Sequence, residues 1–242
     1  MKKTSALLPV SFASALLLAA FAARADTTTN TAIIPVPRTN PTNWVARHEG
    51  FVKQARAGGI DVLFLGDSIT DGWRNRGQAV WQKYYGNLHA ANFGIGGDQT
   101  QHVLWRLDHG EVDGLKPKVT VLMIGTNNTG GRNKTPEIVE GVTAIVKELR
   151  HRMKKSKVLL LAIFPRAEKP DAPQRQQIRE VNLQLAQLDD GKWVKFLDIG
   201  PKFLQPDGTL TREIMPDFLH PNQKGYQIWA DAMEPTLTAM MK

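Results

Sequence analysis

The sequence contains no cysteine. A chain without thiols cannot form disulfide bonds, cannot build a thiolate zinc site and cannot use a cysteine nucleophile. Any covalent catalysis must therefore start from another group, such as a serine hydroxyl.

Motifs for metal ions and nucleotides are also missing. None of the 6 histidines falls in an HExxH pattern, and no glycine-rich loop carries the lysine of a P-loop. The run Gly94-Ile95-Gly96 lacks a glycine or alanine at position 99 and follows the second predicted strand, so it does not fit a dinucleotide-binding loop. We therefore expect neither a metal ion nor a cofactor.

A strong excess of charge of one sign is absent. The formal net charge is +8, and three of the positive charges (Lys2, Lys3 and Arg24) lie in a segment that we expect to be removed, which leaves +5. The densest basic run, residues 150–157, ends a predicted helix, where cations favour the helix dipole and water. It has no interleaved aromatic residues, so we expect no nucleic-acid partner.

The first 25 residues have the pattern of a secretory signal peptide. Lys2 and Lys3 precede an apolar stretch, residues 6–21, and a small-x-small motif ends at Ala25. The stretch is interrupted by polar residues and Pro9, so it is no uninterrupted membrane-spanning run and predicts no stable membrane anchor. We expect cleavage after Ala25 and a periplasmic or secreted product.

The remaining chain predicts one α/β domain. Residues 26–43 are polar and proline-rich and predict an extended N-terminal arm, and the domain occupies residues 44–242. Within it, short apolar runs typical of buried parallel strands alternate with helical patterns. The runs are 60–66, 89–93, 118–125, 157–164 and 193–199, and the clearest helical patterns are 43–56, 135–149, 178–188 and 222–241. This alternation predicts a central parallel five-stranded sheet with helices on both faces.

A possible nucleophile follows the first predicted strand. The carboxyl ends of parallel strands meet at one edge of the sheet, where such folds bind their ligands. Ser68 lies there, at the expected start of a helix, where backbone N–H groups could stabilise a developing anion. The alternative is that Ser68 only caps that helix.

His220 is the best candidate for the base that a serine nucleophile needs. Asp217 lies three residues before it, in a loop that Pro216 and Pro221 keep from being helical. The carboxylate can then hold Nδ1 of the ring while Nε2 faces Ser68. The other histidines fall on predicted helices or at the start of a strand, where structural roles suffice.

Three donors could stabilise the oxyanion of ester hydrolysis. They are the Ser68 N–H, the Gly97 N–H and the side-chain amide of Asn127, which follow the first, second and third strands. The alternative roles are a tight turn for the glycines and a loop-capping amide for Asn127.

Serine, glycine, asparagine and Asp-x-x-His in this order resemble the SGNH (GDSL) hydrolase superfamily. The matching blocks are residues 66–69, 94–98, 125–127 and 217–220, with isoleucine at position 69 where the family name has leucine. The resemblance implies a flavodoxin-like three-layer α/β/α sandwich, a Ser68–His220–Asp217 triad and an oxyanion hole from Ser68, Gly97 and Asn127. It identifies residues 44–242 as an SGNH hydrolase domain.

Residues 89–98, 102–107 and 125–128 are more specifically similar to the catalytic subunits of intracellular platelet-activating-factor acetylhydrolase. This resemblance implies a preference for short acyl groups, with Ile69, Thr126 and Leu219 lining a small acyl pocket. Trp73 and Arg74 follow the first block, where they could stack on and hydrogen-bond a sugar, or instead pack at the rim.

The sequence therefore predicts a serine esterase that acts on a small acyl-ester substrate. Because of the leader, an acetylated carbohydrate fits better than platelet-activating factor. Two alternatives are a lysophospholipase or acetylhydrolase-like lipid esterase and a carbohydrate-binding module without turnover. No particular oligomeric state is predicted.

Overall fold

The computed structural model describes residue 1 and residues 29–38 and 43–242. Apart from Met1, the predicted signal peptide lies outside the described residues. None of the helices in the described part of the chain is both long enough and apolar enough to cross a membrane.

Five parallel strands form one sheet in the order β2-β1-β3-β4-β5. This is the strand order of the flavodoxin fold. The strands are β1 (Val62–Gly66), β2 (Ala90–Gly94), β3 (Val119–Met123), β4 (Lys157–Leu161) and β5 (Val194–Leu197). Each lies inside or within one residue of a predicted apolar run, since a strand covered on both faces must be apolar along its whole length.

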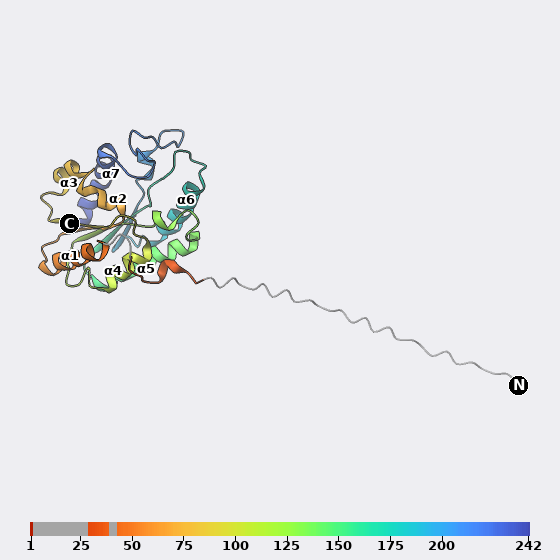
Figure 1. Ribbon diagram of the computed structural model, residues 1–242, viewed down its shortest axis with the longest axis horizontal. Helices are drawn as coiled ribbons and strands as arrows, with labels where there is room; N and C mark the ends of the chain where they lie inside the picture. The colour runs from red at the N-terminus through yellow and green to blue at the C-terminus, as the bar shows by residue number, and fades with distance from the viewer. Residues whose placement is uncertain (2–28, 39–42) are drawn as a thin grey trace.

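Helices cover both faces of the sheet (Figure 1). Strand side chains point alternately to the two faces. Leu63 and Leu65 belong to the apolar cluster that includes residues of α1 (Trp44–Ala57), α4 (Thr100–Asp108), α5 (Thr135–Arg152) and α6 (Pro173–Leu185). Val62 and Phe64 belong to the cluster with α3 (Gln78–Tyr85) and α7 (Gln223–Met241). The predicted three-layer α/β/α sandwich is confirmed.

Several short helices lie between the longer helices and strands or precede them. They are η1 (Thr31–Ile33), α2 (Ser68–Asp71), η2 (Gly72–Arg74), η3 (Thr126–Asn128), η4 (Ala186–Leu188) and η5 (Gly200–Phe203). Two of them, α2 and η3, directly follow the carboxyl ends of β1 and β3, so they lie where the candidate site was predicted.

The described part of the N-terminal arm is attached to the domain. The Thr100 hydroxyl donates a hydrogen bond to the Ala32 carbonyl over 2.8 Å, and Asn30 donates to the Glu140 carboxylate over 2.8 Å. These contacts hold the arm against α4 and α5. It then continues to Arg38, whose guanidinium donates to the Gly96 carbonyl over 2.5 Å, so the described part of the arm reaches the carboxyl edge of the sheet.

Candidate active site

The turn between β1 and α2 places Ser68 at the carboxyl edge of the sheet. A Cβ on Gly66, the last residue of β1, would collide with the Met123 carbonyl and the Thr70 side chain, so only glycine fits there. The Asp67 carboxylate then accepts a hydrogen bond from the Ile69 N–H over 2.9 Å and caps α2. The backbone thus turns sharply at Asp67, and Ser68 begins the helix.

Ser68, His220 and Asp217 lie in one hydrogen-bonded line. Ser68 Oγ is 2.9 Å from His220 Nε2, and His220 Nδ1 is 2.6 Å from Asp217 Oδ2. Because Asp217 holds the proton of Nδ1, Nε2 can accept a proton from the serine hydroxyl. Segments that are 152 residues apart in the sequence therefore form the arrangement that nucleophilic catalysis by serine needs.

The loop that carries His220 is fixed by its own aspartate. The second carboxylate oxygen of Asp217 accepts the Leu219 N–H over 3.1 Å and the His220 N–H over 2.7 Å. Phe218, which lies between Asp217 and Leu219, has a positive φ of 56°, and its carbonyl accepts the Ala167 N–H over 2.9 Å. Burial alone would raise the pKa of Asp217, but the hydrogen bonds from His220 hold it below its ordinary value. The carboxylate therefore stays ionised.

Gly97 and Asn127 are joined across the same edge. Gly97 has φ +81°, which favours glycine, and its loop continues to Asp98, whose carbonyl accepts the Asn127 side-chain amide over 2.9 Å. The Gln99 side chain donates in turn to the Asn127 carbonyl over 2.6 Å. An amide nitrogen carries two hydrogens, so one hydrogen of the Asn127 amide has no acceptor among the described residues.

The three residues predicted to line the acyl pocket lie close to this edge. Ile69 and Thr126 are buried, and Leu219 is half-buried and packs against the cluster that contains Ile69. Ile69 is held through its carbonyl, which accepts the Tyr226 hydroxyl over 2.7 Å. The Thr126 carbonyl accepts a hydrogen bond from Arg166 over 3.0 Å.

The prediction that Trp73 contacts substrate is wrong. Trp73 has 0% exposure, and its ring packs against Tyr226 and Trp229 at centroid distances of 4.4 and 5.0 Å. The turn of η2 directs it into the apolar cluster beneath α7, so it stabilises the core instead of stacking on a sugar. Arg74 is also engaged, because it pairs with Asp71 and donates to the carbonyls of strand β2.

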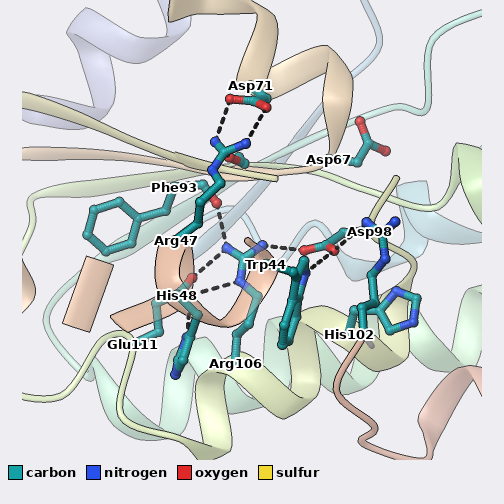
Figure 2. Close-up of polar contacts among 12 residues, drawn as sticks. Trp44, Arg47, His48, Asp67, Asp71, Phe93, Asp98, His102, Arg106 and Glu111 are labelled. Atoms are coloured by element: carbon teal, nitrogen blue, oxygen red, sulfur yellow. Dashed lines mark hydrogen bonds and ion pairs between the residues drawn. The ribbon is translucent and has the colours of Figure 1, made fainter. Parts of the chain in front are cut away.

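A buried charge network, which the sequence had not predicted, supports the loop of Gly97 (Figure 2). Arg106 on α4 is fully buried and pairs with Asp98 over 2.5 Å and with Glu111 over 2.5 Å. Trp44 donates to Asp98 over 2.7 Å, and His48 lies 3.0 Å from Glu111. Burial alone would raise the pKa of Glu111, but Arg106 and His48 hold it below its ordinary value.

The sequence did contain a signal for this network. Arg106 lies three residues after Val103 and next to Leu107, and all three are buried on α4. A cation on the apolar face of a helix needs buried anionic partners. Asp98, which precedes α4, and Glu111, which follows it, are the buried carboxylates that pair with Arg106.

Asp67, next to Ser68, is also fully buried, and its Oδ2 has no hydrogen-bond partner among the described residues. The pKa of Asp67 is raised to about 7, mainly by burial and also by the nearby charge of Asp98, against the opposing influence of the Ile69 N–H and Arg166. Near neutral pH, Asp67 is thus protonated in part.

Comparisons with known proteins show the family of this chain. A model of the GDSL-like lipase/acylhydrolase family matches residues 64–228, which include every residue of the line from Ser68 to His220. The chain belongs to this family. It is therefore a carboxylic ester hydrolase, and the resemblance seen in the sequence is confirmed.

Several curated proteins and solved structures are similar to this chain. Human platelet-activating factor acetylhydrolase IB subunit alpha1 is 36% identical over 199 residues, covering 82% of this chain and 84% of that protein. The rat alpha2 subunit is 41% identical over 185 residues, covering 76% and 78%. A GDSL-like lipase from Bacteroides thetaiotaomicron has a TM-score of 0.63 at 20% identity, covering 80% and 98%. An acetylxylan esterase from Geobacillus stearothermophilus has a TM-score of 0.58 at 20% identity, covering 76% and 94%. At these identities the two structures show the shared fold.

Proposed function

We propose that this esterase cleaves short-chain esters, above all acetyl esters, with Ser68 as nucleophile, His220 as base and Asp217 as the group that orients the base. The observation that carries the proposal is the continuous line of contacts, 2.9 Å from Ser68 Oγ to His220 Nε2 and 2.6 Å from His220 Nδ1 to Asp217. No cofactor takes part in the proposed reaction.

The proposed reaction has two steps, in which the acyl-serine first forms and is then hydrolysed. Ser68 Oγ bonds to the carbonyl carbon while its proton moves to His220 Nε2, and the alcohol then leaves with that proton as the carbon–oxygen ester bond breaks. Water next attacks the acyl-serine, gives a proton to the same nitrogen, and releases the carboxylic acid as Ser68 recovers its proton. Asp217 stays ionised throughout and stabilises the imidazolium that forms in each half.

The oxyanion of each tetrahedral intermediate binds between three donors. We assign these to the N–H groups of Ser68 and Gly97 and to the amide hydrogen of Asn127 that Asp98 leaves free. The donors are held before substrate arrives, so they stabilise the developing charge without reorganising.

The preference for acetyl groups rests on two supports. The curated relatives are named acetylhydrolases, and the side chains of Ile69, Thr126 and Leu219 are of medium size and packed into place. We propose that the alcohol part of the natural substrate is a carbohydrate. A lipid alcohol is the second candidate, because the relatives are named for platelet-activating factor.

An acyl-length and alcohol series tests the proposal. Purified protein should cleave an aryl acetate much faster than the matching octanoate, and acetylated xylan faster than platelet-activating factor or a lysophospholipid. Ser68→Ala should reduce hydrolysis of the aryl acetate by about four to six orders of magnitude while circular dichroism and the melting temperature stay the same. Full activity in folded Ser68→Ala protein would refute the proposed nucleophile.

We also propose that the protein is exported, with the mature chain beginning at Asp26. The supports are the two N-terminal lysines, the apolar stretch and the small-x-small motif before this residue. Mass spectrometry of the protein from cell fractions tests this, since a chain that keeps residues 1–25 and stays in the cytoplasm contradicts export.

A further inference from the structure

The peptide group that joins Gly96 to Gly97 lies in the middle of a tight turn beside Ser68. The Ile95 carbonyl accepts the Asp98 N–H over 3.2 Å, and Gly97 has φ +81°, as at the position of a type II turn that favours glycine. A Cβ placed on Gly96 would lie 3.7 Å from Ser68 Cβ. The N–H that we assign to the oxyanion thus belongs to the central peptide, which the hydrogen bond of the turn does not itself fix.

A central peptide between two glycines can rotate with little steric resistance. Neither glycine has a Cβ that favours one orientation, and a rotated peptide exchanges a type II turn for a type I turn. In a trans peptide the C=O and the N–H point in opposite directions. Rotation would therefore turn the Gly97 N–H away from the oxyanion and bring the Gly96 carbonyl, which repels an anion, into its place.

Arg38 of the N-terminal arm holds the carbonyl side of this peptide. Its guanidinium donates to the Gly96 carbonyl over 2.5 Å, and a Cβ placed on Gly97 would come within 2.9 Å of it. The Gly97 N–H, on the other side of the peptide, has no hydrogen-bond acceptor among the residues that the structure describes. A charged donor at the carbonyl also polarises the amide, which makes the opposite N–H a stronger donor.

Neither an ion pair nor attachment of the arm accounts for this contact. The carboxylate of Asp98 is 3.4 Å from Arg38 and is already paired with the fully buried Arg106 (Figure 2). The arm is attached before it reaches Arg38, through the hydrogen bonds of Asn30 and Ala32 to α5 and α4. The Gly96 carbonyl is therefore the principal partner of Arg38.

Two other arginines hold the preceding carbonyls in the same way. Arg106 donates to the Phe93 carbonyl over 2.5 Å (Figure 2), and Arg47 donates to the Gly94 carbonyl over 2.8 Å. Guanidinium groups thus fix the carbonyl side of the backbone at the end of β2. Arg38 extends this arrangement into the turn that follows the strand.

We infer that Arg38 is a positioning residue of the esterase, which holds the Gly96–Gly97 peptide in the orientation in which the Gly97 N–H binds the oxyanion. The inference rests on the proposed function. It gives the N-terminal arm, which the sequence pattern sets apart from the hydrolase domain, a part in the reaction: without the arm, the central peptide of the turn loses the group that fixes it.

Arg38→Ala tests this inference with an aryl acetate as substrate. We expect kcat to fall about ten- to thirtyfold, a part of the ~10²–10³ that loss of a whole oxyanion donor costs, and KM to stay within about twofold. KM holds because formation and hydrolysis of the acyl-serine both pass through an oxyanion and slow together. Circular dichroism and the melting temperature check the fold, and Arg38→Gln provides the same test if Arg38→Ala does not fold.

Rescue experiments separate positioning of the peptide from packing. Ethylguanidinium contains the atoms that Arg38→Ala removes, so at millimolar concentration it should restore part of the kcat of this variant in a saturable manner. Sodium chloride at equal ionic strength should not. Arg38→Lys still brings a cation to the Gly96 carbonyl and should keep a higher kcat than Arg38→Ala.

Arg150→Ala is the matched control. Arg150 is half-buried at the end of α5 and also donates to backbone carbonyls, those of Met153, Lys154 and Ser156, but before the start of β4, at the amino edge of the sheet. Its loss should change kcat by less than about twofold. An equal fall in the two variants would overturn the inference, because any lost arginine–carbonyl contact would then have the same effect.

The outcomes distinguish failure of this inference from failure of the proposed function. Wild-type kcat in folded Arg38→Ala overturns the inference and leaves the esterase intact, and so does a higher KM at constant kcat, which would make Arg38 a substrate-binding residue. A fall in kcat that neither ethylguanidinium nor Arg38→Lys relieves also overturns it, because lost packing would then suffice. Wild-type protein that cleaves no acetate refutes the esterase proposal itself, and with it the role of Arg38.

Discussion

A single amide hydrogen of Asn127 is expected to carry much of the rate. Asn127→Ala should lower kcat by about 10²–10³ and leave KM nearly unchanged, because the donor acts on charge that exists only in the transition state. Steady-state kinetics with an aryl acetate measures both constants. If KM rises while kcat holds, Asn127 binds substrate and does not stabilise the oxyanion.

Gly97 is expected to tolerate no side chain. Gly97→Ala adds a methyl group at φ +81° and within 2.9 Å of Arg38, so both stability and kcat should fall. Gly114→Ala is the matched control, since Gly114 has the same φ of +81° but no atom within 4 Å of an added Cβ. Both variants should lose about 1–2 kcal/mol of unfolding free energy, and only Gly97→Ala should lose turnover. Equal turnover in the two variants would refute the proposed role of the Gly97 N–H as an oxyanion donor.

Residue types and spacing in the sequence were sufficient to predict that one edge of the sheet gathers Ser68, Asp217, His220, Gly97 and Asn127, because each follows a strand whose end faces that edge. The sequence did not show in which direction a side chain points after a turn. Trp73 lies only five residues from Ser68, yet the turn of η2 directs its ring into the core. Arg38 was missed because its neighbours in space lie 58 and 60 residues away.

At the scale of elements, the network of Arg106 joins α4, α1 and the loop after β2. Arg106→Met should lower the unfolding free energy by about 3–5 kcal/mol, because Asp98 and Glu111 would remain buried without their cation. Urea denaturation followed by circular dichroism measures the change.

Arg152 supplies the control for this prediction. It also bridges several carboxylates, Asp108, Asp113 and Glu148, but on the surface. Arg152→Met should therefore cost less than about 1 kcal/mol. Similar losses in the two variants would show that burial of the Arg106 network does not determine its contribution.

The sheet was the most predictable element. Its five strands are short apolar runs, and burial on both faces leaves little freedom in which residues can occupy them. The ends of the helices were predicted less well, with errors of one residue or more. For example, the helical pattern over 135–149 ends three residues before α5 does, since the helix continues to Arg152, and at the other end Glu137 accepts the N–H of Lys134 over 2.9 Å. Ends depend on such local hydrogen bonds, which periodicity does not encode.

At the scale of the whole molecule, Asp67 makes stability depend on pH. Its folded-state pKa of about 7 lies above its ordinary value of 3.8, so folding favours the protonated form. That contribution is fully present below pH 3.8 and is lost as the pH rises to about 7, with a slope of at most about 1.4 kcal/mol per pH unit. Asp67→Asn should remove this slope, because the amide does not titrate.

Unfolding free energies of both proteins between pH 4 and pH 8 test this prediction. Carboxylates with a lowered pKa, such as Asp217 and Glu111, act in the opposite direction in both proteins and cancel in the difference. A constant difference across that range would show that Asp67 ionises normally in the folded protein.

The 152 residues that separate Ser68 from His220 have a consequence for biosynthesis. With Ser68 as the proposed nucleophile, a growing polypeptide that has left the ribosome only as far as β5 still lacks His220 as proton acceptor, so we expect it not to attack esters. Closing so long a loop is also entropically unfavourable. The return of ester cleavage during renaturation should therefore report when the segment that carries His220 docks beside Ser68.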